Sequence, residues 1–201
     1  ELPMNDNPLE GKTLYWCMTG SFCTVQQAMK QVELVQSTGV NIIPVFSYMM
    51  YATDTRFGQA YDIRKQIEGI TGNKVLCRIV DVEPIGPMNL ADLVVIAPCT
   101  GNTIAKLMNG IIDTPVLMAA KSQLRNQKPV VIALATNDAL GNNAVNIAAA
   151  MDRPNIYMVP LGQDDVEKKP RSMVAHFSLL PQTVMNALEG KQVRPVFQDY
   201  E

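Results

Sequence analysis

Small polar residues follow a strongly apolar run near the middle of the chain. Residues 93–97 are apolar and rich in β-branched side chains, which is typical of a buried parallel strand. Pro98 ends the run, and Thr100, Asn102 and Thr103 then supply two hydroxyls and an amide directly before a helical pattern. Because the first N–H groups of a helix lack partners, this turn suits an anion or a polar heterocycle. The alternative is an ordinary turn with a helix cap, since Gly, Asn and Thr are common in both.

Three more strand ends carry the same kind of residue. Thr19-Gly20-Ser21 follows the apolar run 12–18, Ser47 follows the run 40–46, and Thr136 follows the run 129–135. In a doubly wound parallel sheet these turns all lie at one edge, where ligands bind. Gly20 would let the backbone approach a phosphate closely. The dinucleotide fingerprint G-x-G-x-x-G is absent, so the combination favours a mononucleotide.

The elements that must position these turns alternate regularly along the chain. We expect strands at residues 12–18, 40–46, 75–80, 93–97, 129–135 and 155–159, and helices at 24–37, 58–70, from 104 onward, 115–126, 139–151 and 179–190. This alternation predicts an α/β fold, a single-domain Rossmann-like doubly wound parallel sheet in three α-β-α layers.

The domain is expected to span residues 11–190. Residues 1–10 are polar and contain proline, and we expect a disordered lead-in there, while residues 191–201 form a polar C-terminal tail. The charged loop 162–172 is a candidate lid or docking loop for a partner chain, with a plain solvated loop as the alternative.

Composition argues against several classes of protein. The chain has 201 residues, 47% hydrophobic and 18% charged, which suits one well-filled domain. A net charge of −2 without a basic block argues against a nucleic-acid partner, and no apolar run approaches the roughly 20 residues that span a bilayer. Four cysteines without a C-x-x-C pair, together with a single histidine, argue against a metal site and fit a reducing cytoplasm.

The polar strand ends also resemble a known family. T-G-S after the first strand, Ser47 after the second, and A-P-C-T-G-N-T-I-A-K at positions 97–106 are similar to motifs of the FMN-binding flavoproteins. That family includes the cysteine decarboxylases of coenzyme A and lantibiotic synthesis and the flavin prenyltransferases. The resemblance implies bound FMN. It assigns the phosphate to Thr19, Gly20, Ser21, Ser47, Thr100 and Thr103, and the ribityl chain or ring to Pro98, Asn102 and Thr136.

Further motifs resemble one subgroup of the family. They are D-T-R-F-G at 54–58, E-P-I-G-P at 83–87, D-T-P-V-L-M-A-A-K at 113–121 and T-N-D-A-L-G at 136–141, together with the charged loop. The resemblance implies one component of a two-component oxidoreductase of sporulating bacteria, which forms a dicarboxylate from a dihydropyridine-level intermediate of lysine biosynthesis. The partner component would resemble a nicotinamide-dependent dehydrogenase and would carry the NAD(P). The family also implies a homo-oligomer built from trimers.

The chain departs from the decarboxylase pattern in two places. The family's histidine after the second strand is missing, since His176 is the only histidine, and the P-x-M-N-x-x-M helix motif is replaced at residues 115–121. Peptidyl-cysteine decarboxylation is therefore disfavoured, and no side chain is assigned as catalytic. Asn102 matches the residue that contacts a substrate carboxylate in the family, and Arg56 and Lys121 could neutralise a dicarboxylate. The alternative for both cations is a solvated surface charge.

Two functions from different classes follow. In the first, the chain binds FMN and the flavin oxidises a dihydropyridine-type ring. In the second, the chain is a binding or scaffolding component that has kept the fold, while its partner performs the redox chemistry.

Overall fold

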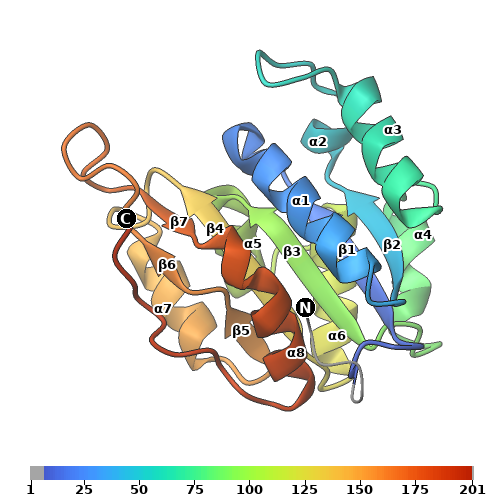
Figure 1. Ribbon diagram of the computed structural model, residues 1–201. Coiled ribbons are helices and arrows are strands. Elements are labelled where there is room, and N and C mark those ends of the chain that lie inside the picture. The colour runs from blue at the N-terminus through green and yellow to red at the C-terminus, as the bar shows by residue number, and fades with distance from the viewer. Residues whose placement is uncertain (1–6, 201) are drawn as a thin grey trace.

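The computed structural model describes residues 7–200, and a sheet of seven strands forms its centre (Figure 1). Residues 1–6 of the predicted lead-in lie outside the described residues, and Leu9 is fully buried. The strands are β1 (Thr13–Met18), β2 (Asn41–Phe46), β3 (Leu93–Cys99), β4 (Val130–Thr136), β5 (Ile156–Met158), β6 (Leu161–Gly162) and β7 (Met173–Ala175). β1 to β5 are parallel in the order β2-β1-β3-β4-β5.

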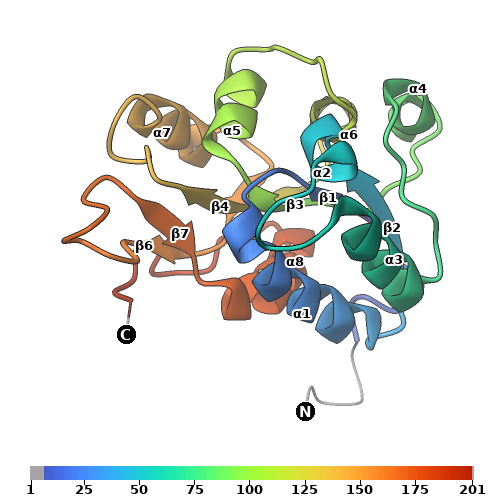
Figure 2. The same cartoon turned by 90° about the horizontal axis from the view of Figure 1, so that it is seen from above.

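Helices cover both faces of the sheet, as Figure 2 shows from above. The helices are α1 (Val25–Gln36), α2 (Tyr48–Ala52), α3 (Ala60–Thr71), α4 (Ile79–Val82), α5 (Gly101–Met108), α6 (Pro115–Arg125), α7 (Ala144–Asp152) and α8 (Leu180–Leu188). Short 3-10 turns are Phe22–Thr24, Glu83–Ile85 and Phe177–Leu179. The apolar faces of α1, α3 and α8 bury one side of the sheet, and those of α4 to α7 bury the other, which makes two hydrophobic cores. The predicted three-layer α/β fold is confirmed.

The sheet is mixed rather than wholly parallel, which corrects one part of the prediction. β7 pairs antiparallel with the end of β4, and β6 pairs antiparallel with β7. The reason is the short connection between them: residues 163–172 are too few for a parallel crossover but sufficient for a hairpin. The predicted charged loop is therefore the tip of an antiparallel pair. The chain after α8 returns to this pair, since the Gln198 N–H donates to the Leu161 carbonyl at 3.1 Å.

Residues 75–80 do not form the predicted strand. Leu76 makes a single parallel bridge to Val45, and the chain then turns into α4. The ion pair of Arg78 with Asp81, three residues later at 2.6 Å, is compatible with this helical turn and adds a few tenths of a kcal/mol to it. Among residues 7–200, no helix is long and apolar enough to cross a membrane.

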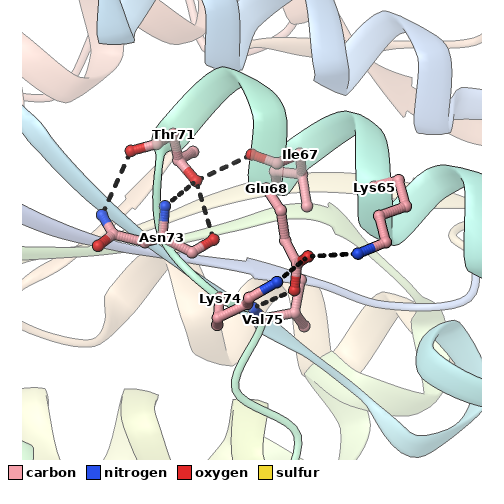
Figure 3. Close-up of polar contacts among 7 residues, drawn as sticks. All are labelled: Lys65, Ile67, Glu68, Thr71, Asn73, Lys74 and Val75. Carbon is pink, nitrogen blue, oxygen red and sulfur yellow. Dashed lines mark hydrogen bonds and ion pairs between the residues drawn. The ribbon is translucent and has the colours of Figure 1, made fainter.

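A polar cluster holds the chain between α3 and that bridge (Figure 3). Glu68 accepts a hydrogen bond from the Val75 N–H at 3.1 Å and forms an ion pair with Lys74 at 3.2 Å, while the Asn73 amide donates to the Ile42 carbonyl at 2.7 Å. The Val75 N–H is the largest cause that lowers the pKa of Glu68 below its ordinary value, and Lys74 adds to the effect. The cluster fixes the end of α3 against the edge strand β2.

We expect Glu68→Gln to lower the free energy of unfolding by about 1 kcal/mol near neutral pH, because the amide oxygen accepts more weakly from the Val75 N–H and the ion pair with Lys74 is lost. The folded-state pKa is depressed, so the stabilisation is present above the unfolded pKa of about 4.3 and is lost as pH falls through the folded value. Urea titrations at several pH values measure this. The difference from the parent chain should shrink as the pH falls below about 4.3 and vanish once the pH lies below the folded-state pKa. Glu33→Gln, on an exposed turn of α1, is the control and should show no such pH-dependent loss.

Candidate functional site

Thr19 joins the ends of β1 and β3 at the carboxyl edge of the sheet. Its N–H and its hydroxyl both donate to the Pro98 carbonyl, at 3.1 and 2.8 Å, and its hydroxyl oxygen accepts from the Thr100 N–H at 2.9 Å. The side chain is almost completely buried. Thr19 therefore positions the two turns, and its hydroxyl proton is already committed to a backbone carbonyl.

Ser21 extends this connection to β4. Its hydroxyl donates to the Ala135 carbonyl at 3.1 Å, and Ala135 lies next to Thr136 at the end of β4. The Thr136 hydroxyl accepts from the Asp138 N–H at 3.3 Å. The ends of β1, β3 and β4 are thus brought together, as the sequence predicted from their polar residues.

Two helix starts face this edge with capped ends. Thr100 caps α5, since its hydroxyl accepts from the Thr103 N–H at 3.1 Å and lies 2.8 Å from the Thr103 hydroxyl. Ser47 caps α2 in the same way, by accepting from the Met50 N–H at 3.2 Å. Asn102 is exposed in the first turn of α5.

Unpaired N–H groups remain at these turns. Within residues 7–200, the N–H groups of Gly20, Gly101 and Asn102 form no hydrogen bond with the protein. They lie at the positive ends of helices, or in the turn that leads to one, so they favour an anion. We call this set of turns, residues 19–21, 47 and 100–103, the strand-end cradle.

Gly101 is a cradle residue that the sequence analysis did not single out. A Cβ at this position would lie 2.7 Å from both the Asn143 amide nitrogen and the Thr136 hydroxyl. The start of α5 therefore packs directly against the end of β4 and the start of α7. Asn143, directly before α7, was missed as well; its side chain does not cap α7, and its amide donates to Asp138 at 3.4 Å.

The candidate reactive groups of the chain lie outside the cradle or are unreactive. Cys99 is fully buried beside the cradle, and burial raises the pKa of its thiol, so it remains protonated and acts as a packing residue. His176 stacks on Tyr200, with ring centroids 4.3 Å apart, and lies 3.3 Å from the Gln198 carbonyl. Among the described residues, no group of three or more His, Cys, Asp or Glu side chains could hold a metal ion.

The two predicted substrate cations lie apart from each other. Arg56 is exposed in the loop between α2 and α3, where its guanidinium lies 4.8 Å from the centre of the Phe57 ring. That loop projects beyond the carboxyl edge (Figure 1). Lys121 instead lines a pocket with Gln127 and Asn155, which lie shortly before the amino ends of β4 and β5. The structure brings Asn102 to the cradle and places Lys121 at the opposite edge of the sheet.

A mixed α/β sheet with polar helix starts at its carboxyl edge belongs to the class of open α/β folds, which bind ligands at that edge. The chain belongs to the flavoprotein family, whose family model matches residues 4–153. It is 45% identical over 188 residues to the B-type subunit of dipicolinate synthase of Bacillus subtilis (strain 168), and the match covers 94% of each chain.

Solved structures show the same fold. The crystal structure of the B-type subunit of dipicolinate synthase from Bacillus halodurans C superposes with a TM-score of 0.88 at 41% identity, covering 95% of this chain and 98% of that one. The FMN-dependent cysteine decarboxylase SpaF superposes with a TM-score of 0.64 at 22% identity, covering 89% and 98%. The second similarity concerns the fold alone.

We expect Thr19→Val to destabilise the chain by about 1–3 kcal/mol, because the Thr100 N–H loses its acceptor while the shape of the side chain is kept. Thr19→Ser retains the hydroxyl and should cost clearly less. Chemical denaturation of both variants tests this. Equal losses in the two variants would mean that the methyl group contributes as much as the hydroxyl, and a Thr19→Val chain as stable as its parent would mean that the hydroxyl does not matter at this position.

We expect Gly101→Ala to lower the free energy of unfolding by about 1–3 kcal/mol, because the added methyl group overlaps two side chains. Gly69→Ala is the matched control within α3, where a Cβ meets nothing within 4 Å and φ is not positive. Gly69→Ala should instead stabilise the chain by about 0.4–1 kcal/mol. Thermal and urea unfolding measure both. A Gly101→Ala chain as stable as its parent would contradict the close packing of α5 against β4.

Proposed function

We propose that the chain is the B-type subunit of a two-component dipicolinate synthase. With the A-type subunit of that enzyme it would help convert the dihydrodipicolinate-level intermediate of lysine biosynthesis to dipicolinic acid during sporulation, in the cytoplasm of the mother cell. The observation that carries the proposal is the 45% identity to the Bacillus subtilis protein over 94% of both chains. An identity this high over nearly the full length of both chains supports the same function for both.

FMN is the proposed cofactor, and the donors of the cradle fit its phosphate. Ser47 and Thr103 offer hydroxyls, and Gly20, Gly101 and Asn102 offer free N–H groups at helix starts. A Cβ on Gly20 would lie 3.2 Å from the Phe22 ring, so this position of the cradle favours glycine. Bound flavin would supply hydride chemistry. The described residues of the chain would bind and orient it.

Substrate recognition is proposed at the same edge. The Asn102 amide lies exposed at the start of α5 and can donate to a carboxylate, and Arg56 on the projecting loop can approach a second one. Pro98 and Thr136 border the cradle and would flank the ribityl chain or the ring. The nicotinamide cofactor would belong to the A-type subunit, and the chain would assemble into a trimer-based homo-oligomer.

A binding or scaffolding role is the second candidate, and the side chains of the cradle favour it. They are hydroxyls and amides, and burial keeps the adjacent Cys99 thiol protonated. These groups can orient a ligand, but they are poorly suited to transfer a proton to or from it. In that role the A-type subunit would carry out the redox step. A flavin-dependent decarboxylase is a weaker alternative, because His176 lies outside the cradle in contact with Tyr200.

We expect the purified chain to co-elute with a flavin absorption band at about 450 nm, or to acquire one when FMN is added. Ser47→Asp should abolish the band, because Asp keeps the helix cap but places a negative charge against the phosphate. Ser47→Asn is the matched control, since Asn caps equally well without the charge, and it should retain at least part of the binding. If the parent chain gave no band and bound no FMN, the cofactor proposal would be wrong.

The two candidate roles separate when the chain is combined with the A-type subunit. If this chain is catalytic, the Ser47→Asp variant should stop formation of dipicolinate by the reconstituted pair, whereas Ser47→Asn should sustain it. Product formation that continues with a flavin-free chain would instead support the scaffolding role. Product is measured by its ultraviolet absorption after separation of the protein.

A further inference from the structure

A pocket of about 670 Å³ lies at the edge of the sheet opposite the cradle. Its walls come from the turn after α5, the second half of α6 and the segment that leads from α7 into β5. Gln127 and Asn155, which line it, lie shortly before β4 and β5, so the pocket is at the amino ends of the strands. A ligand there would not share contacts with one bound at the carboxyl edge.

Three cations from two separate elements line this pocket. Lys121 and Arg125 come from α6, and Arg153 comes from the connection after α7. Within residues 7–200, none of the three forms an ion pair, although other cations of the chain do. The nearby Asp113 is already neutralised by Lys106 at 2.7 Å, and the exposed Asp152 does not line the pocket.

Local helix structure accounts for only part of this concentration of charge. Lys121 and Arg125 are four residues apart on α6, a spacing at which like charges repel. Arg125 in the last turn of α6 and Arg153 at the C-cap of α7 are each favoured by the dipole of their helix, whereas Lys121 lies one turn before the end of α6 and is not. Three cations that line one pocket without an acidic partner are stabilised when an anion binds between them.

Apolar side chains form the remaining walls and define the shape of the ligand. Leu107, Ile112, Leu124 and Pro154 line the pocket beside the cations. A volume of about 670 Å³ lies in the usual range for small-molecule sites and exceeds what an isolated phosphate would fill. Apolar walls with several cations suit a ring-sized body that carries two carboxylates, and an arginine binds a carboxylate through two parallel hydrogen bonds.

We propose that this amino-edge pocket binds a small aromatic dicarboxylate through Lys121, Arg125 and Arg153, separately from the strand-end cradle. The site binds and releases the dianion without a chemical step. The choice of pyridine-2,6-dicarboxylate as the probe rests on the proposed function, whereas the pocket itself does not. In this arrangement the chain carries one anion site at each edge of its sheet.

Isothermal titration of the full chain with pyridine-2,6-dicarboxylate tests the proposal. We expect saturable binding of one dianion at the amino-edge pocket, in addition to any that binds at the carboxyl edge, and this binding should be weakened at least about tenfold by Arg153→Gln and by Lys121→Gln. Lys168→Gln removes an exposed charge from the loop between β6 and β7, and it should leave the affinity unchanged. Pyridine-2-carboxylate should bind more weakly, because it lacks the second carboxylate.

The flavin band, read on the same samples, separates this proposal from the function proposed above. Arg153→Gln should leave the band unchanged, and Ser47→Asp should leave dicarboxylate binding unchanged. Absence of binding, or an affinity that Arg153→Gln does not alter, would overturn the proposal. Inorganic phosphate that binds as tightly as the dicarboxylate and is weakened by the same substitutions would overturn the assignment to a dicarboxylate.

Discussion

Pro98 interrupts the central strand of the sheet, and the polar edge is built around that interruption. A proline has no N–H, so the ladder between β3 and β4 is interrupted there, and it resumes in a shifted register where Cys99 pairs with Leu134. The carbonyls of Ala97 and Pro98 accept instead from the Trp16 indole at 3.1 Å and from the Thr19 hydroxyl at 2.8 Å. Buried carbonyls must be paired, and these two bonds pair them by connecting β1 to β3 close to the ends of both strands.

The two edges of the sheet hold opposite kinds of polar group. The carboxyl edge offers hydroxyls, amides and helix-start N–H groups, which are weak individually but directed at one region. The amino edge offers the full charges of Lys121, Arg125 and Arg153. Directed dipoles suit a ligand that must be oriented, such as a cofactor. Flexible charged side chains suit a small anion that enters and leaves.

Much of the fold was predictable because parallel strands buried on both faces read as unbroken apolar runs. The runs at β1, β2, β3, β4 and β5 were identified in this way, and their alternation with helices implied the layers. Residues 75–80 were misassigned because a strand needs a partner along its length, and beyond the single bridge of Leu76 the chain turns into α4. The antiparallel pairing of β7 with β4 joins residues far apart in sequence, and no local pattern reveals it.

The sequence by itself determined which turns carry polar residues and, through the β-α alternation, that Thr19, Ser47, Thr100 and Thr136 meet at one edge. The tertiary structure alone decided what each residue does there. It directs the Thr19 hydroxyl to the Pro98 carbonyl and packs Gly101 against the end of β4. It also placed Lys121 at the edge opposite the cradle. The physical reason is that the position of a strand or helix follows from local periodicity, whereas a hydrogen-bond partner or a pocket depends on contacts between segments that are distant in the chain.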